Sequence, residues 1–251
     1  MPVSLALALL LWELAVRLWN LPAFMLPAPG LVGKRLLQVL VDGSLLYHSL
    51  FTLLEVLAGM ALGVSSATIL GYLLAKSAIV ERLLSPYIVA SQSVPVVAIA
   101  PLLVIWFGPG LFSKVLVCAL IVFFPVLINT MVGIRSVPDD LRELMRSLRA
   151  TGWQTFVNLE VPAASPVFLA GLRVGATLAV IGAVVGEFVG ADRGLGYLIN
   201  RARGQYDTAL VFVSVLTLVL LALLLYGLVA HLERRLLTWR EPSKGMLVKQ
   251  E

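Results

Sequence analysis

The sequence is poor in charge and in the residues that build metal sites and disulfides. Only 13% of its 251 residues are charged, whereas 60% are hydrophobic, and the mean hydropathy is +0.98. Soluble domains carry about 25% charged residues, so this composition excludes an ordinary soluble fold and indicates a protein of the lipid bilayer. The single cysteine, Cys118, can form no disulfide within the chain, and we expect it to be a packing residue. His48 and His231 are far apart in the sequence, which argues against a shared metal site.

The chain also lacks the short motifs of common enzymes. It contains no G-x-x-x-x-G-K-[ST] phosphate loop, no H-E-x-x-H and no G-x-S-x-G. The apolar segments show no pair of carboxylates suited to hydrolysis. We therefore expect no catalytic residues, no metal and no cofactor in this chain, with an integral membrane enzyme as a minor alternative. If ATP drives the protein, a separate chain must bind the nucleotide.

Long apolar segments divide the chain into about six predicted transmembrane helices, which makes the fold class all-α and polytopic. A span needs about 20 apolar residues. We treat 1–251 as a single membrane domain with a core at about 45–235, because no stretch is long and polar enough to form a second core. A basic tail follows at 232–251. The predicted spans are 4–19, 50–75, 83–107, 111–134, 167–190 and 208–231.

The first apolar segment has two interpretations. A cleaved signal peptide would carry a basic start and a small-residue cleavage site, and both are missing here, so we favour a retained span. An even number of spans places both termini on one side of the membrane. Most of the Lys and Arg residues then fall on that side, which makes both termini and the basic tail cytoplasmic. The same bias accounts for the net charge of +5 without a nucleic-acid partner.

The stretch 135–166, which we call the elbow, interrupts the apolar pattern between the fourth and fifth predicted spans. It is dense in charges of both signs. Its middle predicts a short amphipathic helix with Leu141, Leu144, Met145 and Leu148 on one side. Such a helix can bind a groove on a soluble partner, and the alternative is a helix that lies on lipid head groups. We favour the partner surface.

The elbow resembles the coupling-loop signature of ABC importer permeases, the binding-protein-dependent inner-membrane components. That signature reads E-A-A, three residues, G, nine residues, I-x-L-P. Glu143 and Pro162 stand at the required spacing, and Leu159-Glu160-Val161-Pro162 fills the end of the pattern. Arg149 stands where the signature has glycine, although Gly152 follows three residues later. The two alanines are replaced by Leu144 and Met145.

The resemblance covers about residues 25–235. Within the family, the chain is similar to the nitrate, sulfonate and taurine branch, which also includes permeases for thiamine-precursor pyrimidines and riboflavin. This similarity is carried by P-A-P after the first segment, His48-Ser49-Leu50, P-L-L-V-I-W-F-G from Pro101, Phe123-Phe124-Pro125 with Asn129-Thr130, Gly171-Leu172-Arg173, and Glu187 before Gly194-Leu195-Gly196.

This resemblance implies a type I ABC importer permease fold in a bacterial or archaeal cytoplasmic membrane. It implies a second permease copy as a homodimer, an ATP-binding cassette ATPase that holds ATP and Mg and grips the elbow, and an extracytoplasmic solute-binding protein. The residues expected to dock the ATPase are Arg142, Glu143, Arg146, Leu148, Gly152, Trp153, Phe156 and Pro162.

Two further sets of residues are singled out within the spans. Small residues at helical spacing allow close helix approach, either within one subunit or at a pore or two-fold interface: Gly59, Gly63, Gly171, Gly175, Gly182 and Gly186. Polar residues that face the path or cross-link helices are Gln92, Ser93, Asn129, Thr130 and Glu187. For Glu187 we favour a structural ion pair with Arg193, Arg201 or Arg203 over contact with solute.

The solute is left open at this stage. The branch transports sulfonates, taurine and nitrate as well as riboflavin and pyrimidine vitamin precursors. The spans contain no cluster of basic residues that could hold an anion, which favours the vitamin side, although the binding protein is expected to set selectivity. A self-sufficient ion-coupled secondary transporter is the alternative to an ATP-driven importer.

Overall fold

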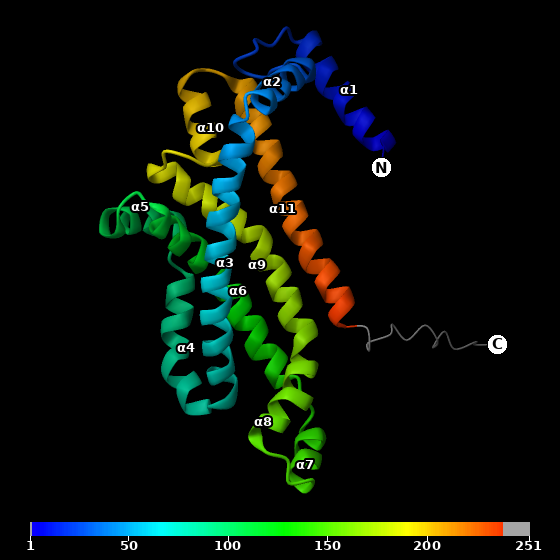
Figure 1. The fold of residues 1–251 in the computed structure, drawn as a ribbon, viewed down its shortest axis with the longest axis vertical. Helices are drawn as coiled ribbons and strands as arrows, with labels where there is room; N and C mark the ends of the chain where they lie inside the picture. The colour runs from blue at the N-terminus through cyan, green and yellow to red at the C-terminus, as the bar shows by residue number, and fades with distance from the viewer. Residues whose placement is uncertain (1, 238–251) are drawn as a thin grey trace, which may run out of the picture.

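The computed structural model describes residues 2–237 and consists, over that part of the chain, of helices joined by short turns (Figure 1). The predicted all-α class is therefore confirmed. In chain order the helices are α1 (Pro2–Leu18), α2 (Pro29–Val41), α3 (Ser44–Lys76), α4 (Ala78–Gln92), α5 (Val96–Phe107), α6 (Leu111–Arg135), α7 (Asp139–Ser147), α8 (Gly152–Thr155), the π-helical turn η1 (Phe156–Glu160), α9 (Val161–Gly190), α10 (Leu195–Gly204) and α11 (Thr208–Leu236).

Three long helices, α3, α6 and α9, pack side by side and form the centre of the bundle, while α11 lies along α9 (Figure 1). Small residues allow this close approach. The fully buried Cys118 of α6 lies between Gly59 of α3 and Gly182 of α9, so close that a side chain at either glycine would overlap it. The packing role expected for Cys118 agrees with this position.

The number of spans is lower than the sequence predicts. Within residues 2–237, four helical segments are long and apolar enough to cross a membrane, or five if α4 and α5 count as one bent span. The first predicted span forms α1, which has 17 residues and is not among them. Figure 1 shows α1 leaning away from the bundle, and Trp12 stacks on Phe212 of α11 at a ring-centroid distance of 5.3 Å.

The predicted span 83–107 is divided into two helices, α4 and α5. Helices α4 and α5 meet at an angle of 94°. The cause is Pro95, which fixes its own backbone, removes a hydrogen-bond donor and disfavours helical geometry at Val94. The first helix therefore ends at Gln92, and Pro95 becomes the residue before α5. Pro86 and Pro101 are accommodated inside the two helices.

The two ends of the bundle are built differently. Helices α2 and α10 lie at one end, where Arg35 of α2 pairs with Asp207 at 2.8 Å and fastens α2 to the start of α11 (Figure 1). The elbow, with α7 and α8, forms the opposite end. The predicted basic tail lies outside the described residues from position 238 onward.

Candidate functional site: the elbow and the buried polar network

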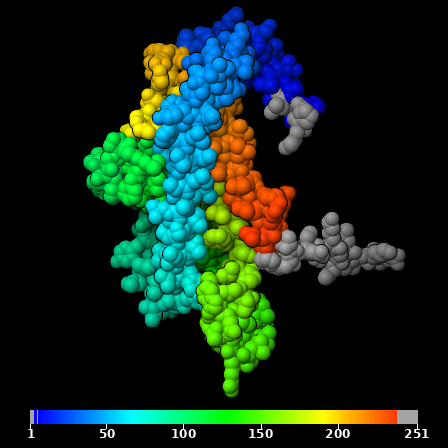
Figure 2. All heavy atoms as spheres, in the orientation of Figure 1, coloured from blue at the N-terminus to red at the C-terminus, as the bar shows by residue number. Residues whose placement is uncertain are grey.

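The elbow projects beyond the rest of the bundle at one end of the molecule (Figure 2, the lime-green surface). Its first helix, α7, carries Asp139 and Asp140 in the first turn and Arg146 in the last turn, which complements the helix dipole. Large apolar side chains are exposed along the elbow, among them Leu141, Leu144, Leu148 and Trp153. An apolar patch among charges at a protruding end is a typical protein contact surface.

The bend after α7 is a Schellman motif built on Arg149. The Ala150 N–H donates to the Met145 carbonyl at 2.9 Å, and the Arg149 N–H donates to the Arg146 carbonyl at 2.9 Å. Arg149 itself adopts the left-handed conformation, with φ of +53°. Glycine is the usual residue at this position of the motif, because it has no Cβ to strain. The chain therefore turns where the signature has its glycine, with arginine in its place.

The second half of the elbow leads without a break into α9. Thr151 and Gln154 form a reciprocal capping box at the start of α8. The π-helical turn η1 follows, and the whole stretch Gly152–Gly190 is one helical run of 39 residues. The turn ends just before Pro162, which cannot donate a backbone hydrogen bond. Leu159-Glu160-Val161-Pro162 thus marks the junction between the elbow and the span.

Most of the predicted docking residues lie on the exposed surface of the elbow. Two of the others are engaged within the chain: Arg142 donates to the Ile134 carbonyl at 2.8 Å and so caps α6, and Phe156 packs between Tyr72 and Trp153. Pro162 is half-buried in the first turn of α9. The exposed members of the predicted set are Glu143, Arg146, Leu148, Gly152 and Trp153.

The polar residues predicted to face a path are not brought together. Gln92 and Ser93 are exposed at the bend between α4 and α5. Asn129 and Thr130 of α6 each donate to a carbonyl one turn earlier in their own helix, at 2.8 and 2.7 Å. Glu187 lies near the other end of the bundle from the elbow. No common site forms from this set.

The six glycines singled out from the sequence all lie against α6. Gly59 and Gly63 of α3 contact it from one side, and Gly171, Gly175, Gly182 and Gly186 of α9 contact it along the length of that helix. A Cβ at Gly63 would stand 2.7 Å from the Ala119 carbonyl oxygen, and one at Gly171 would overlap Asn129. Within the described chain, these glycines therefore serve packing inside one subunit.

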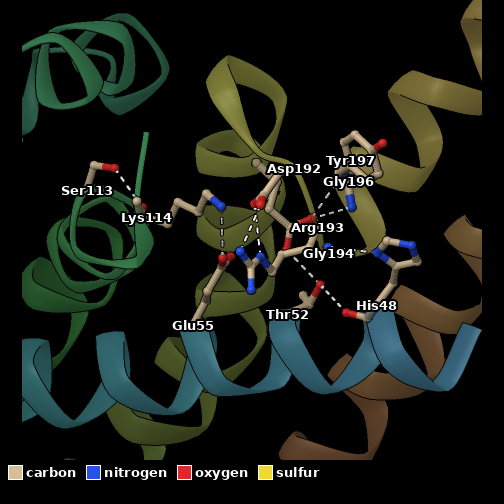
Figure 3. Close-up of polar contacts among 12 residues, drawn as sticks. His48, Thr52, Glu55, Ser113, Lys114, Asp192, Arg193, Gly194, Gly196 and Tyr197 are labelled. Carbon is tan, nitrogen blue, oxygen red and sulfur yellow. Dashed lines mark hydrogen bonds and ion pairs between the residues drawn. The ribbon is translucent and has the colours of Figure 1, made fainter. Parts of the chain in front are cut away.

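A buried polar network lies at the α10 end of the bundle (Figure 3). The N–H groups at the start of α10 would otherwise lack partners. The Gly194 N–H donates to His48 Nδ1 at 3.1 Å, and the Leu195 N–H donates to Thr52 Oγ1 at 2.8 Å. The Gly196 and Tyr197 N–H groups both donate to the Glu187 carboxylate. The network thus caps α10 with side chains from α3 and α9.

The Glu187 carboxylate is held in place by the N–H groups that it caps at the start of α10. The carboxylate also accepts a hydrogen bond from the Thr52 hydroxyl at 2.6 Å and is 1% exposed. A negative charge at a helix N-terminus is stabilised by the aligned peptide dipoles. The predicted pairing with Arg193, Arg201 or Arg203 is wrong, because backbone amides and a hydroxyl take the place of an arginine. Arg193 instead bonds to the neighbouring Asp192 and thereby lowers the pKa of that carboxyl.

Glu55 is a member of the network that the sequence analysis missed. It is 1% exposed and pairs with the buried Lys114 of α6 at 3.3 Å (Figure 3). It also lies beside Glu187. Two carboxylates thus lie side by side within the bundle, which the search for a pair suited to hydrolysis did not anticipate. Because both groups are enclosed, the pair leaves no room for a reacting molecule. The sequence did carry a signal, since His48, Thr52 and Glu55 share one face of α3 at spacings of four and three.

Residues 2–237 thus form a bundle of long apolar helices with a protruding elbow of mixed charge, the architecture of a polytopic membrane protein. The family comparison agrees: residues 59–238 match the binding-protein-dependent transport system inner membrane component. The chain therefore belongs to this family of ABC transporter permeases.

Curated relatives cover nearly the whole chain. It is 51% identical over 239 residues to the riboflavin transport system permease protein RibX of Chloroflexus aurantiacus, covering 95% of this chain and 89% of that protein. It is 39% identical over 233 residues to the formylaminopyrimidine transport permease protein ThiX of Halalkalibacterium halodurans, covering 93% and 92%.

A solved structure has the same fold. A chain of the MetNI methionine ABC transporter in an inward-facing form superimposes with a TM-score of 0.70 at 19% sequence identity. The match covers 78% of this chain and 97% of that one. The predicted family and permease fold are confirmed, and the protein is a multi-pass permease subunit of the cytoplasmic membrane.

Proposed function

We propose that two copies of this chain form the translocation path of an ATP-driven importer for riboflavin or a closely related neutral heterocycle. The observation that carries the proposal is the 51% identity to the riboflavin permease RibX over 95% of the chain. The sulfonate permease SsuC of Bacillus subtilis is 33% identical over a similar length, so the riboflavin protein is the better guide to the solute.

The charges inside the bundle favour a neutral solute. Lys114 is buried and pairs with Glu55, and Arg173 of α9 pairs with Glu233 of α11. Neither cation is left to bind nitrate, taurine or a sulfonate. A neutral ring system with hydrogen-bonding edges needs no fixed counter-charge.

The elbow supplies the surface on which the ATPase would dock. Its exposed Leu144, Leu148 and Trp153 would fill a groove on a cytoplasmic ATPase, while Glu143 and Arg146 would set the orientation. That ATPase would hold ATP and Mg. A solute-binding protein would dock at the α10 end, outside the membrane, and the end of α11 would lie on the cytoplasmic side with the elbow. Binding and release of ATP would then move the elbows and alternate the access of the path.

Uptake by the whole complex tests the solute. The chain would be purified in mild detergent with every chain that copurifies, then reconstituted in liposomes loaded with ATP. We expect uptake of labelled riboflavin that stops when ATP is replaced by a non-hydrolysable analogue. Uptake of taurine or nitrate in place of riboflavin would show that the transported solute is an anion and would contradict the proposed solute class. Uptake driven by an ion gradient without ATP would overturn the ATP-driven importer.

The docking surface is tested by reversing one charge. The Glu143→Arg variant should enter the membrane normally but retain less ATPase during purification, because Glu143 is exposed in the middle of α7, the first helix of the elbow. Gln205→Arg, an exposed change at the opposite end of the bundle, is the control and should retain the ATPase. Equal ATPase recovery and transport in the two variants would contradict the docking assignment.

A further inference from the structure

A buried carboxylate joins the elbow to α3 at the point where the elbow becomes a membrane span. Glu160, the last residue of η1, is 1% exposed. It accepts a hydrogen bond from the Tyr72 hydroxyl at 3.1 Å and forms an ion pair with the Lys76 ammonium group. Tyr72 and Lys76 lie four residues apart on one face of α3, and Lys76 is its last residue. Each oxygen of the Glu160 carboxylate therefore has a donor from α3.

The elbow side of this contact is a continuous rod. Helix α8, the turn η1 and α9 form one helical run, Gly152–Gly190, so a displacement of α8 is carried directly to Glu160. In the widened turn, the Val161 N–H bonds to the Phe156 carbonyl five residues back. Such π-helical turns are frequent at functional sites. Here the turn places Glu160 on the buried side of the rod.

Elsewhere at this level α3 and the rod are held apart. An apolar groove of about 650 Å³ runs between them, lined by Ile69, Tyr72 and Leu73 from α3 and by Trp153 and Phe156 from the rod. Apart from the edge-on contact of the Tyr72 and Phe156 rings, at 5.3 Å, the carboxylate cluster is the bridge that the structure describes across this groove. The carboxylate cluster is therefore the polar link between α3 and the rod beside this groove.

A second contact ties the same two helices near their other ends, where the Thr52 hydroxyl of α3 donates to Glu187 of α9 at 2.6 Å. We infer that Glu160, Tyr72 and Lys76 form a coupling joint: they transfer a displacement of the elbow to α3, so that α3 and α9 move as one body during transport. Glu160 is thus a positioning residue. This inference rests on the proposed ATP-driven function and specifies how the elbow acts on the spans.

The first test measures how tightly transport follows ATP hydrolysis in the reconstituted complex. Glu160→Gln keeps the shape of the side chain but removes the charge that faces Lys76. We expect solute transported per ATP hydrolysed to fall about tenfold, as for loss of one charge-assisted contact, while ATP hydrolysis stays within about twofold. Exchanging the charges, with Glu160→Lys and Lys76→Glu together, should restore at least about half of the wild-type ratio.

A matched control removes another ion pair at the same end of the bundle. Glu81→Gln breaks the contact of Glu81 with Arg135, at 2.6 Å, which joins α4 to α6 and not α3 to α9. The ratio of transport to hydrolysis should stay at the wild-type value. If Glu160→Gln only lowers the yield of complex and leaves the ratio unchanged, Glu160 is a stability residue and the inference is overturned.

A second readout needs no transport. Spin labels at Ile79→Cys and Asn158→Cys, both exposed, report the distance between the first turn of α4, which follows directly on α3, and the rod. The native Cys118 is buried. We expect a narrow distance distribution in the wild type and a broader or longer one with Glu160→Gln. An unchanged distribution would overturn the joint. Absence of ATP-driven uptake by the wild type would instead contradict the proposed function. The distances between the labels would still show whether Glu160 holds the end of α3 against the rod.

Discussion

Gly194 lies directly against the carboxylate of Glu187, so close that a Cβ at position 194 would overlap it. Gly194 also adopts a φ of +109°, a conformation that other residues rarely take. The contact explains why a glutamate within a membrane span is followed by Gly-Leu-Gly. The carboxylate needs the backbone amides at the start of α10, and only glycine lets them approach.

Substitution at Gly194 should loosen the cap of α10. We expect Gly194→Ala to lower the free energy of unfolding by about 2 kcal/mol or more, since the strained backbone alone costs about 1–2 kcal/mol. Reversible unfolding in mixed micelles measures the change. Gly204→Ala, at the other end of α10 with open space around it, should change stability by less than about 0.5 kcal/mol. Equal stability of the two variants would refute the cap.

Removing the Thr52 hydroxyl should weaken the hydrogen bonding of two buried groups. Thr52→Val keeps the shape but deprives the Leu195 N–H of its acceptor and Glu187 of a donor. The expected loss of stability is about 1–3 kcal/mol. Thr68→Val is the matched control on the same helix, because the Thr68 hydroxyl bonds to its own helix at Val64. A loss no larger than that of the control would show that the hydroxyl is dispensable.

The contact of α3 with α6 should tolerate no added methyl group at Gly63. Its Cβ would stand 2.7 Å from the Ala119 carbonyl oxygen, which belongs to the backbone and cannot rotate away. We expect Gly63→Ala to destabilise the protein by about 1–3 kcal/mol. Gly227→Ala in α11 meets open space and should be neutral or stabilising by up to about 1 kcal/mol. The order of the two unfolding midpoints decides the question.

The elbow should become more stable when Arg149 is replaced by glycine. Arg149 holds a left-handed conformation that strains its Cβ, and glycine removes that strain of about 1 kcal/mol. Hydrogen exchange at the Arg149 and Ala150 amides, the donors of the Schellman motif, should slow accordingly. Arg146→Gly, inside α7, should have the opposite effect. Faster exchange in the Arg149→Gly variant would contradict the reading of the bend.

Parts of the fold and site could be predicted because they depend on short stretches of sequence. The apolar runs of α3, α6, α9 and α11 exceed the thickness of a bilayer, and each is a property of one segment alone. The elbow was recognisable because its charges interrupt those runs.

Other features depended on which helices meet. The sequence around Glu160 does not reveal that the end of α3 brings Tyr72 and Lys76 to it, and nothing near Glu187 indicates that the start of α10 folds back onto its carboxylate. The size of the bend at Pro95, 94° between α4 and α5, also depended on the tertiary structure, because hydropathy continues smoothly across a change of direction.

By itself, then, the sequence determined a helical membrane protein with a polar elbow of the importer type, since hydropathy and motif spacing are local. The tertiary structure decided the partner of each buried charge. A charge withdrawn from water must find a counter-charge or a set of donors nearby, and the glycine contacts along α6 fix which helices supply them.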